Sequence, residues 1–322
     1  MPSSEPEPVL CLGPFMPGVE ERLSRRFAVL PATPETLDAI IAEHGAAIRA
    51  MTTRGHGPTD ATLMDRLPRL ELIATFAVGY DTIDVAAAKA RGIVVTNTPD
   101  VLTDEVADLT VGLTLATIRE LPQADRFLRA GAWPKGAYPL TASLRDRSIG
   151  IVGMGRIGQA IAARLKPFGR PIAYHARRKV KGLDYEHFPD LTALAAAVDV
   201  LIVILPGGPA TRGVIDAGVL QALGPRGVLI NVARGSVVDE PALIAALKTG
   251  TIAAAGLDVF AQEPDVPAEL IQMGNVVLLP HVGSGTHVTR AAMADLAMRN
   301  VESWFDGRGP VTPVPETPWP RD

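Results

Sequence analysis

The sequence predicts an α/β fold with about two domains, in which parallel sheets are covered by helices on both faces. Three observations lead to this prediction. The chain has 322 residues, which is about the length of two ordinary domains. Short apolar runs alternate with helical patterns along most of the chain, and such alternation is typical of parallel sheets. A glycine-rich turn, Gly153–Gly158, joins one apolar run to an amphipathic helix.

The composition limits the classes of protein to consider. With 47% hydrophobic and 20% charged residues, it is typical of a globular protein. The net charge of −4 gives no electrostatic reason to expect a nucleic acid or an anionic membrane as partner. Cys11 is the only cysteine, so we expect no disulfide framework, no bound metal and a reducing, cytoplasmic location. The N-terminus does not look like a signal peptide, and the longest apolar run, Val200–Leu205, is too short to cross a bilayer.

The first part of the chain, from about Val9 to Asp100, shows short strands alternating with helices. The expected strands are Phe27–Leu30, Ala47–Met51, Leu72–Phe76 and Ile93–Thr96. Both ends of the chain are rich in proline, and we expect them to form extended surface tails.

A long helix is expected from Thr103, which is a good N-cap and is followed by two acidic residues. After a loop rich in glycine and proline, a second alternating series begins. Its expected strands are Ser148–Val152, Pro171–His175, Val200–Leu205, Val228–Val232, Ala253–Asp258 and Val276–Leu279. Its expected helices are Gly158–Phe168, Asp190–Ala197, Gly218–Leu223 and Pro241–Thr249, and a last helix over Thr289–Phe305 ends near Gly307.

The glycine-rich turn has the spacing of a dinucleotide-binding loop. It reads Gly153-Met154-Gly155-Arg156-Ile157-Gly158, with an apolar strand before it and an amphipathic helix after it. Gly153 allows the tight turn, Gly155 lets the backbone approach a pyrophosphate, and Gly158 lets helix and strand pack closely. The alternative is an ordinary glycine turn between a strand and a helix.

The end of the next strand indicates which dinucleotide binds. An NAD site usually has an acidic residue there, which bonds the ribose 2′-hydroxyl. This chain instead has Tyr174-His175-Ala176-Arg177-Arg178. Arginine pairs with a 2′-phosphate through charge-assisted hydrogen bonds, so we expect NADP to be preferred, with NAD possible. The alternative is that Arg177 and Arg178 are solvated surface charges. His175 suits packing or ribose contact better than catalysis.

Three polar residues follow three of the expected strands. They are Arg234, Glu263 and His281. Because strand ends of a parallel sheet face the ligand crevice, the three side chains should converge there. Histidine can protonate a carbonyl oxygen, a carboxylate can favour its charged form, and arginine can hold a substrate carboxylate. Each residue alone reads better as a surface charge; the set predicts a hydride-transfer site.

These motifs resemble the D-2-hydroxyacid dehydrogenase family over essentially the whole stretch from Val9 to Val314. The blocks that carry the resemblance include IGIVGMGRIGQAIAARLKPFG, LINVARGSVVDEPALIAAL and VVLLPHVGSGTHVTRAAMADL. Within the family, the chain looks most like NADPH-preferring hydroxypyruvate/glyoxylate and hydroxyphenylpyruvate reductases. The resemblance implies two Rossmann-like, doubly wound domains with the active site in the cleft between them. It also implies reduction of a small 2-keto acid to the D-2-hydroxy acid.

The resemblance assigns roles to individual residues. Arg234, Glu263 and His281 match the catalytic set, and the amides of Val78 and Gly79 match those that bind the substrate carboxylate. The positions that match the nicotinamide half of the cofactor site, or its loops, are Leu205, Pro206, Thr211, Val232, Ala233, Asp258 and Gly283.

The resemblance also implies a domain plan. The substrate domain would comprise residues 1–101 and 289–322, and the dinucleotide domain residues 102–288. The family is usually homodimeric through the long helix and loop of Thr103–Tyr138, where Trp133 matches a tryptophan that can reach the partner's active site. Alternatively, Trp133 is an aromatic residue buried in the dimer interface that makes no contact with the substrate. The stretch Arg49–Asp60 should hold the substrate-covering loop, with Thr52 and Thr53 against the substrate.

Two other functions remain open. One is an NAD-linked relative of the phosphoglycerate dehydrogenase type, against which the missing acid after Tyr174 argues. The other is a cofactor-sensing binding protein, similar to the transcriptional corepressors that share this fold.

Overall fold

The computed structural model describes residues 6–13, 19–54 and 59–320. Its contacts divide the chain into two compact units, which comprise Met1–Leu102 with His287–Asp322 (unit 1) and Thr103–Thr286 (unit 2). Each unit holds one sheet, and all strand pairs of both sheets are parallel. The α/β fold class predicted from the alternating pattern is therefore confirmed.

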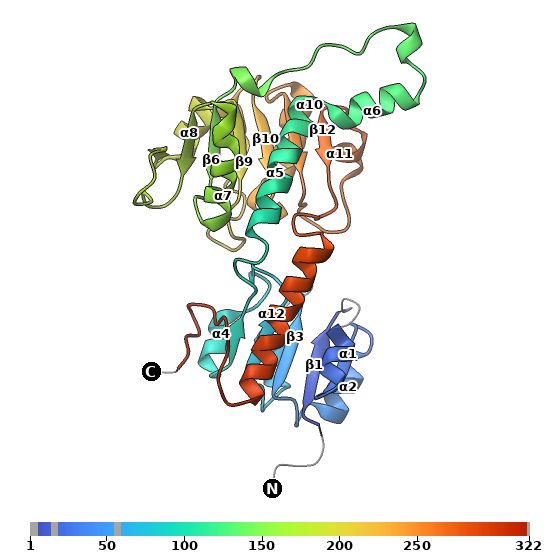
Figure 1. Cartoon of the computed structure of the whole chain (residues 1–322), viewed down its shortest axis with the longest axis vertical. Helices are drawn as coiled ribbons and strands as arrows, with labels where there is room; N and C mark the ends of the chain where they lie inside the picture. Colours follow the sequence, from blue (N-terminus) through green and yellow to red (C-terminus); the bar gives the residue numbers. More distant parts are fainter. Residues whose placement is uncertain (1–5, 14–18, 55–58, 321–322) are drawn as a thin grey trace. The chain divides into compact units, whose positions relative to one another are not determined.

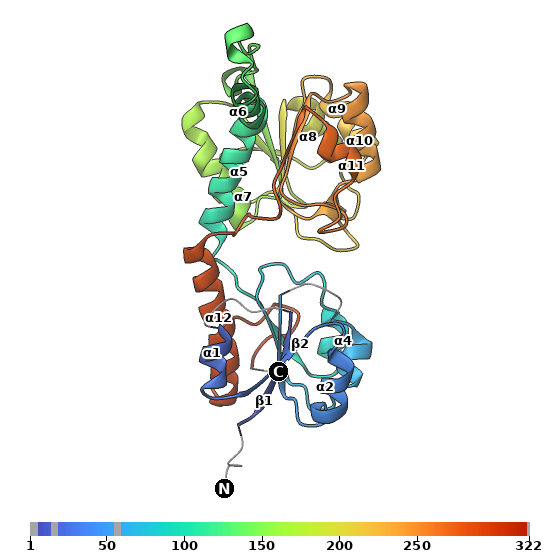
Figure 2. The same cartoon turned by 90° about the vertical axis from the view of Figure 1, so that its right-hand side faces the viewer.

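Unit 1 is a five-stranded sheet with helices on both faces (Figures 1 and 2). The strand order is β2-β1-β3-β4-β5, and the strands are β1 Pro8–Leu12, β2 Ala28–Ala32, β3 Ala50–Thr53, β4 Leu72–Thr75 and β5 Val94–Thr96. One apolar core lies between the sheet and helices α1 Val19–Ser24 and α12 His287–Phe305. The other lies beneath α2 Leu37–His44, α3 Ala61–Asp65 and α4 Val85–Ala90.

The prediction of extended surface tails needs correction at both ends of the described chain, while Pro2 lies outside the described residues. Pro8 begins β1, a strand that pairs with β2 on one side and β3 on the other, so it lies inside the sheet. Near the other end, Val314 is only 1% exposed and its N–H donates to the carbonyl oxygen of Val95 at 2.9 Å. The ring of Trp319 packs edge-on against Trp304. Proline suits both segments, because neither the first residue of a strand nor an extended chain beside an edge strand needs every N–H for the ladder.

Unit 2 is a seven-stranded sheet with the order β12-β11-β10-β9-β6-β7-β8. The strands are β6 Ile149–Val152, β7 Ile172–His175, β8 Glu186–Phe188, β9 Val200–Val203, β10 Val228–Asn231, β11 Ala254–Leu257 and β12 Val276–Leu278. The chain runs outward from β6 through β7 to β8, and then returns to β9 and proceeds the other way. The order reverses between β6 and β9, which is where ligands bind in sheets of this type.

Helices cover both faces of this sheet (Figure 2). On one face lie α5 Thr103–Ile118 and α7 Arg156–Leu165, and α5 begins at the predicted Thr103. The other face carries α8 Leu191–Ala197, α9 Ala217–Leu223, α10 Glu240–Thr249 and α11 Ala268–Gln272. Asp190, Asp216 and Asp239 cap α8, α9 and α10, because each side chain accepts the N–H three residues on.

An arm extends from unit 2 between α5 and β6 (Figure 1). It contains α6 Leu121–Arg129 and the short 3₁₀ turns η1 Trp133–Lys135 and η2 Leu144–Asp146. No side chain of α6 is buried. Four large apolar side chains of the arm are exposed, with Trp133 at 65% and Leu140 fully open, together with Leu121 and Leu128.

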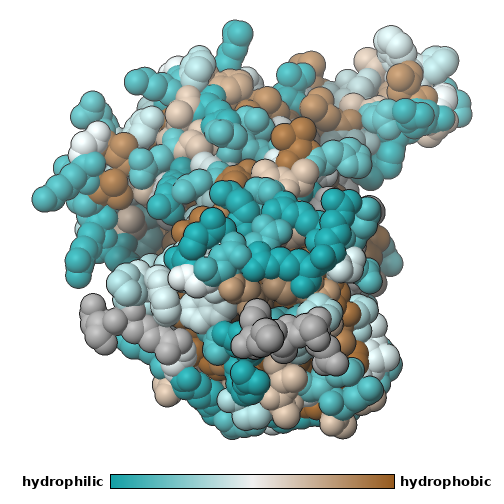
Figure 3. Space-filling model, turned by 60° about the horizontal axis from the view of Figure 1, so that its bottom comes forward, coloured by the Kyte–Doolittle hydropathy of each residue, from teal (hydrophilic) through white to brown (hydrophobic). Residues whose placement is uncertain are grey.

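One face of the molecule is drawn in space-filling form in Figure 3. Hydrophilic side chains predominate on the face drawn in Figure 3, and hydrophobic ones are scattered among them. Within the described ranges, no helix is both long enough and apolar enough to cross a membrane.

Candidate active site

The glycine turn joins β6 to α7 at the reversal point of the sheet of unit 2. Gly153 has a φ of +105°, and a side chain there would overlap the backbone of Ile204. A Cβ at Gly158 would overlap the carbonyl of Gly153, so only glycine lets α7 begin this close to β6. Gly155 has open space beside it and is exposed, as is Arg156. The first amides of α7 can therefore be reached by a phosphate group, to which a helix N-terminus is attractive.

The segment after β7 holds the two expected arginines on the surface. Arg177 and Arg178 are exposed. The backbone around them is fixed from both ends, because Nε2 of His187 donates to the carbonyl of Ala176 at 2.9 Å and the N–H of Val180 donates to the Tyr174 hydroxyl at 2.9 Å. The His187 and Tyr174 rings are 5.1 Å apart. We call His187 and Tyr174 the clamp. No sequence pattern indicated it, because His187 lies on the edge strand β8 Glu186–Phe188, which was not predicted.

His175, by contrast, has a structural partner. Its Nδ1 lies 3.0 Å from the carbonyl oxygen of Phe188, so the ring ties β7 to β8. Only the other ring nitrogen remains for a cofactor.

Arg234 stands at the end of the segment that follows β10. The buried side chain of Asn231 shapes this segment, since its amide donates to the carbonyl of Arg234 at 3.1 Å and its oxygen accepts the N–H of Ala233 at 3.1 Å. The next residue, Gly235, packs so tightly on the backbone of Phe260 that a Cβ would overlap it. This packing holds together the segments that follow β10 and β11. The positive charge of Arg234 is close enough to Glu263 to lower the pKa of its carboxyl.

Glu263 and His281 form a direct pair. Oε2 of Glu263 lies 2.6 Å from Nδ1 of His281, and Oε1 accepts the N–H of Phe260 at 3.0 Å. Burial would raise the pKa of the Glu263 carboxyl, but the hydrogen bonds from His281 and Phe260 and the charges of His281 and Arg234 bring it below its ordinary value. The carboxylate therefore stays ionised, and it faces Nδ1 while Nε2 of the imidazole is left for a substrate.

Asp258 holds the backbone that carries His281. Its carboxylate is 2% exposed and accepts the N–H of Val282 and that of Gly283, each at 2.8 Å. Burial raises the pKa of this carboxyl, although the two amides oppose the shift. His281 has a φ of +52°, a conformation that is unfavourable for a side chain with a Cβ. Asp258 and Gly283 were expected to line the cofactor. In the structure the carboxylate of Asp258 accepts a hydrogen bond from the N–H of Gly283.

The remaining expected cofactor residues lie at the same edge of the sheet. Leu205 and Pro206 follow β9, and the Thr211 hydroxyl donates to the carbonyl of Pro206 at 2.7 Å. Val232 and Ala233 follow β10 and are buried. Because all these strands are parallel, their carboxyl ends lie along one edge, together with the glycine turn.

The expected substrate residues lie in unit 1. Val78 and Gly79 belong to a half-buried loop after β4, in which Nδ2 of Asn97 donates to the carbonyl of Val78 at 2.9 Å. Thr52 and Thr53 were expected in a covering loop, but β3 extends to Thr53 and both residues are buried. The strand was predicted at Ala47–Met51, so its expected start is three residues too early and its expected end two residues too early. The rest of that loop, residues 55–58, lies outside the described residues.

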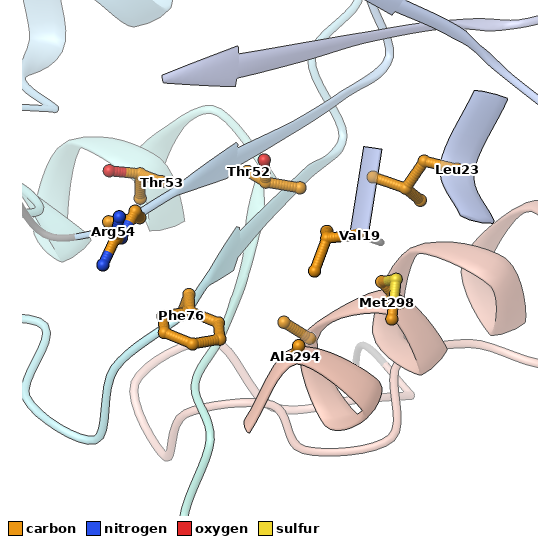
Figure 4. Close-up of a pocket in the computed structure, with 9 residues that line it drawn as sticks. Val19, Leu23, Thr52, Thr53, Arg54, Phe76, Ala294 and Met298 are labelled. Carbon is orange, nitrogen blue, oxygen red and sulfur yellow. The ribbon is translucent and has the colours of Figure 1, made fainter. Parts of the chain in front are cut away.

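Thr52 and Thr53 still reach an open space. Together with Arg54 and Phe76 they line one side of a pocket within unit 1, and its other side is formed by α1 and α12 (Figure 4). The residues contributed by these helices are Val19, Leu23, Ala294, Ala297 and Met298.

Comparisons with known proteins identify the family. Residues 111–283 match the model of the NAD-binding domain of D-isomer specific 2-hydroxyacid dehydrogenases. Glyoxylate/hydroxypyruvate reductase A of Arabidopsis thaliana is 46% identical over 308 residues, which are 95% of this chain and 98% of that protein. Hydroxyphenylpyruvate reductase of Plectranthus scutellarioides is 44% identical over 308 residues, with the same shares covered.

A solved structure is similar along the whole chain. It is the NADPH-dependent glyoxylate/hydroxypyruvate reductase of Sinorhizobium meliloti in complex with NADP and malonate. It is 50% identical to this chain with a TM-score of 0.94, and the match covers 99% of each chain. The family model covers the glycine turn at Gly153–Gly158. The solved structure matches along both units, each of which holds one parallel sheet. The chain belongs to the D-isomer specific 2-hydroxyacid dehydrogenases, which are oxidoreductases that act on CH–OH groups.

Proposed function

We propose that this protein reduces a small 2-keto acid, such as glyoxylate or hydroxypyruvate, to its D-2-hydroxy acid with NADPH. The observation that carries the proposal is the hydrogen-bonded pair of Glu263 and His281, which lies after β11 and β12 at the same edge of the sheet as the glycine turn. Relatives with reductase activity on these acids, at 46% and 50% identity, support the choice of substrate.

Each residue of the site has a place in this reaction. The bound cofactor supplies the hydride that is added to C2 of the keto acid. His281 gives a proton from Nε2 to the carbonyl oxygen, so that the carbonyl group becomes a hydroxyl group. Glu263 stabilises the protonated imidazole through Nδ1. Arg234 polarises the carbonyl and binds the carboxylate, to which the amides of Val78 and Gly79 also donate.

NADPH is the proposed cofactor because of the exposed pair Arg177 and Arg178 after β7. The pair lies where a 2′-phosphate would sit, if the pyrophosphate binds at the first turn of α7. The open backbone at Gly155 fits such a cofactor. NADH should be accepted more weakly, since its 2′-hydroxyl cannot use the two charges.

We also propose a homodimer that forms through the arm. Leu121, Leu128, Trp133 and Leu140 are exposed in the single chain, and a second copy would cover them. Analytical ultracentrifugation of the protein and of Leu128→Asp tests this, because a charge in the interface should favour the monomer. A cytoplasmic location fits the single, buried Cys11 and is testable by fractionation.

The test of the function is a steady-state assay. Glyoxylate and hydroxypyruvate are each offered with NADPH and with NADH, and we expect turnover with NADPH to be the faster. The variant His281→Asn keeps the size of the side chain but cannot deliver a proton, so kcat should fall by about 10²–10⁴-fold. A wild-type protein without turnover of any 2-keto acid would contradict the proposal.

A further inference from the structure

Two arginine side chains lie against one aromatic ring in unit 1. Cζ of Arg54 is 5.7 Å from the centroid of the Phe76 ring, and Cζ of Arg290 is 5.8 Å from the same centroid. Arg54 follows β3, Phe76 follows β4, and Arg290 belongs to the start of α12. Both distances are within the range of cation–π attraction. The ring thus gathers two positive charges from distant parts of the sequence.

The second of these charges has no carboxylate to balance it. Arg290 is half-buried, and within the described part of the chain no carboxylate forms an ion pair with it. Burial, and after it the charge of Arg54, lower the pKa of the Arg290 guanidinium. Removing a cation from water and placing it near a like charge costs free energy unless an anion compensates. The cluster is therefore arranged to gain from a bound anion.

The cluster borders the pocket in unit 1. Arg54 and Phe76 line this pocket next to Thr52 and Thr53, at the ends of two neighbouring strands (Figure 4). The hydroxyl oxygen of Thr52 is buried and lies beside the thiol of Cys11 on the neighbouring strand. The opposite wall is apolar and consists of side chains from α1 and α12. The lining is mostly apolar, with Arg54 as its one charged residue, so the pocket suits a short apolar stem whose negatively charged end lies beside Arg54.

One lining residue of the pocket, Phe76, also begins the loop assigned to the substrate carboxylate. Phe76 is only two residues before Val78, and its N–H donates to the carbonyl of Thr53 at 2.7 Å. This bond fixes the start of the loop to β3, the strand that leads to Arg54. A keto acid whose carboxylate is bound by the amides of Val78 and Gly79 would extend its side chain from that loop.

We propose that Arg54 and Arg290 form an anion subsite for a second carboxylate, carried on the side chain of the 2-keto acid. The inference rests on the proposed function. It adds short 2-keto diacids to the substrates that the protein is expected to reduce. The apolar wall contacts the methylene groups of such a substrate, and the guanidinium groups bind its distal carboxylate.

The experiment compares matched pairs of keto acids. Oxaloacetate and 2-oxoglutarate carry a second carboxylate, whereas 2-oxobutanoate and 2-oxopentanoate have a methyl group in its place. The measured quantity is the ratio of kcat/KM for the diacid to kcat/KM for its partner. Charge-assisted bonds to a carboxylate predict that this ratio falls about 10- to 100-fold in Arg290→Met. Arg290→Lys keeps the charge and should give an intermediate ratio.

Arg299→Met is the matched control, because Arg299 lies on the same helix and pairs with Asp295 on the surface. It should leave the ratio unchanged. An equal fall of kcat/KM for both members of a pair in Arg290→Met would show a packing role and overturn the subsite. An unchanged ratio would overturn it as well.

Binding measurements separate this proposal from the proposed function. Calorimetric titration of the wild type and of Arg290→Met with succinate and with butanoate needs no turnover. We expect succinate to bind the wild type more tightly than butanoate does, and the difference to shrink in the variant. Equal affinities in the wild type would contradict the subsite even if glyoxylate is reduced. Absence of turnover with a retained preference for succinate would contradict the function alone.

Discussion

The backbone N–H of His281 donates to the carbonyl oxygen of Asp258 at 2.9 Å, while the Asp258 carboxylate accepts the N–H groups of the two residues that follow His281. One residue thus holds three consecutive amides. The imidazole of His281 is presented from a left-handed backbone conformation that few residues adopt without support. In this arrangement Asp258 acts as a positioning residue, and Glu263 orients the ring itself.

The first prediction concerns Asp258→Asn. An amide side chain can accept only one of the two N–H groups, so the other loses its partner at a cost of about 1–3 kcal/mol. We expect a lower Tm and a loss of kcat that exceeds any rise in KM. Asp216→Asn is the control, because it removes one charge from the same unit but keeps an equally good helix cap. A wild-type kcat in Asp258→Asn would refute the positioning role.

The second prediction concerns the pH dependence of Glu263→Gln. In the wild type the pKa of Glu263 is below its ordinary value of about 4.3, so its charge is present above that pH and is lost only as the pH falls through the lowered value. Glutamine removes the charge that stabilises the protonated imidazole. The basic limb of the profile of kcat/KM for reduction should therefore move to lower pH, with a milder loss in acid. A limb that stays in place would mean that Glu263 does not tune His281.

The third prediction concerns Arg177→Ala. Loss of a charge-assisted contact to the 2′-phosphate should raise KM for NADPH about 10- to 100-fold and leave KM for NADH nearly unchanged. Lys248→Ala removes one positive charge from a distant, exposed site of the same unit and should change neither value. Equal effects of Arg177→Ala on both cofactors would rule out the assignment.

The fourth prediction tests the clamp. His187→Phe keeps an aromatic ring next to Tyr174 but removes the donor to the carbonyl of Ala176. The segment that carries the two arginines should lose its fixed conformation, and KM for NADPH should rise about 2- to 10-fold, the worth of one net hydrogen bond. The effect on KM for NADH should be smaller. If both KM values rise together, the clamp serves only to stabilise the fold.

Much of the fold could be predicted because local signals agree with the packing. The α5 helix begins at the predicted Thr103, and the strands of unit 2 lie at the predicted apolar runs, because buried parallel strands consist of such runs. The strand β1 was not predicted, since the surrounding prolines suggested a tail. The edge strand β8, with Glu186 and His187, is too polar for an apolar pattern to reveal it.

The residues of the candidate site also fall into those that the sequence predicts and those that it does not. Residues at strand ends, such as Glu263 and His281, could be placed together because the carboxyl ends of parallel strands share one edge. The proximity of Arg54 and Arg290 could not, because it depends on how α12 packs on the sheet of unit 1. Spacing along the sequence carries no information about such a contact.

The discontinuity of unit 1 has a consequence for its biosynthesis. Its strands are made first, but α12 and the segment with Val314 and Thr317, which cover one sheet face and the edge strand β5, are made last. Unit 2 is continuous and can fold as soon as it emerges from the ribosome. The sheet of unit 1 cannot bury its apolar face against α12 until that helix has been made, and an apolar face left uncovered in the meantime is prone to aggregation.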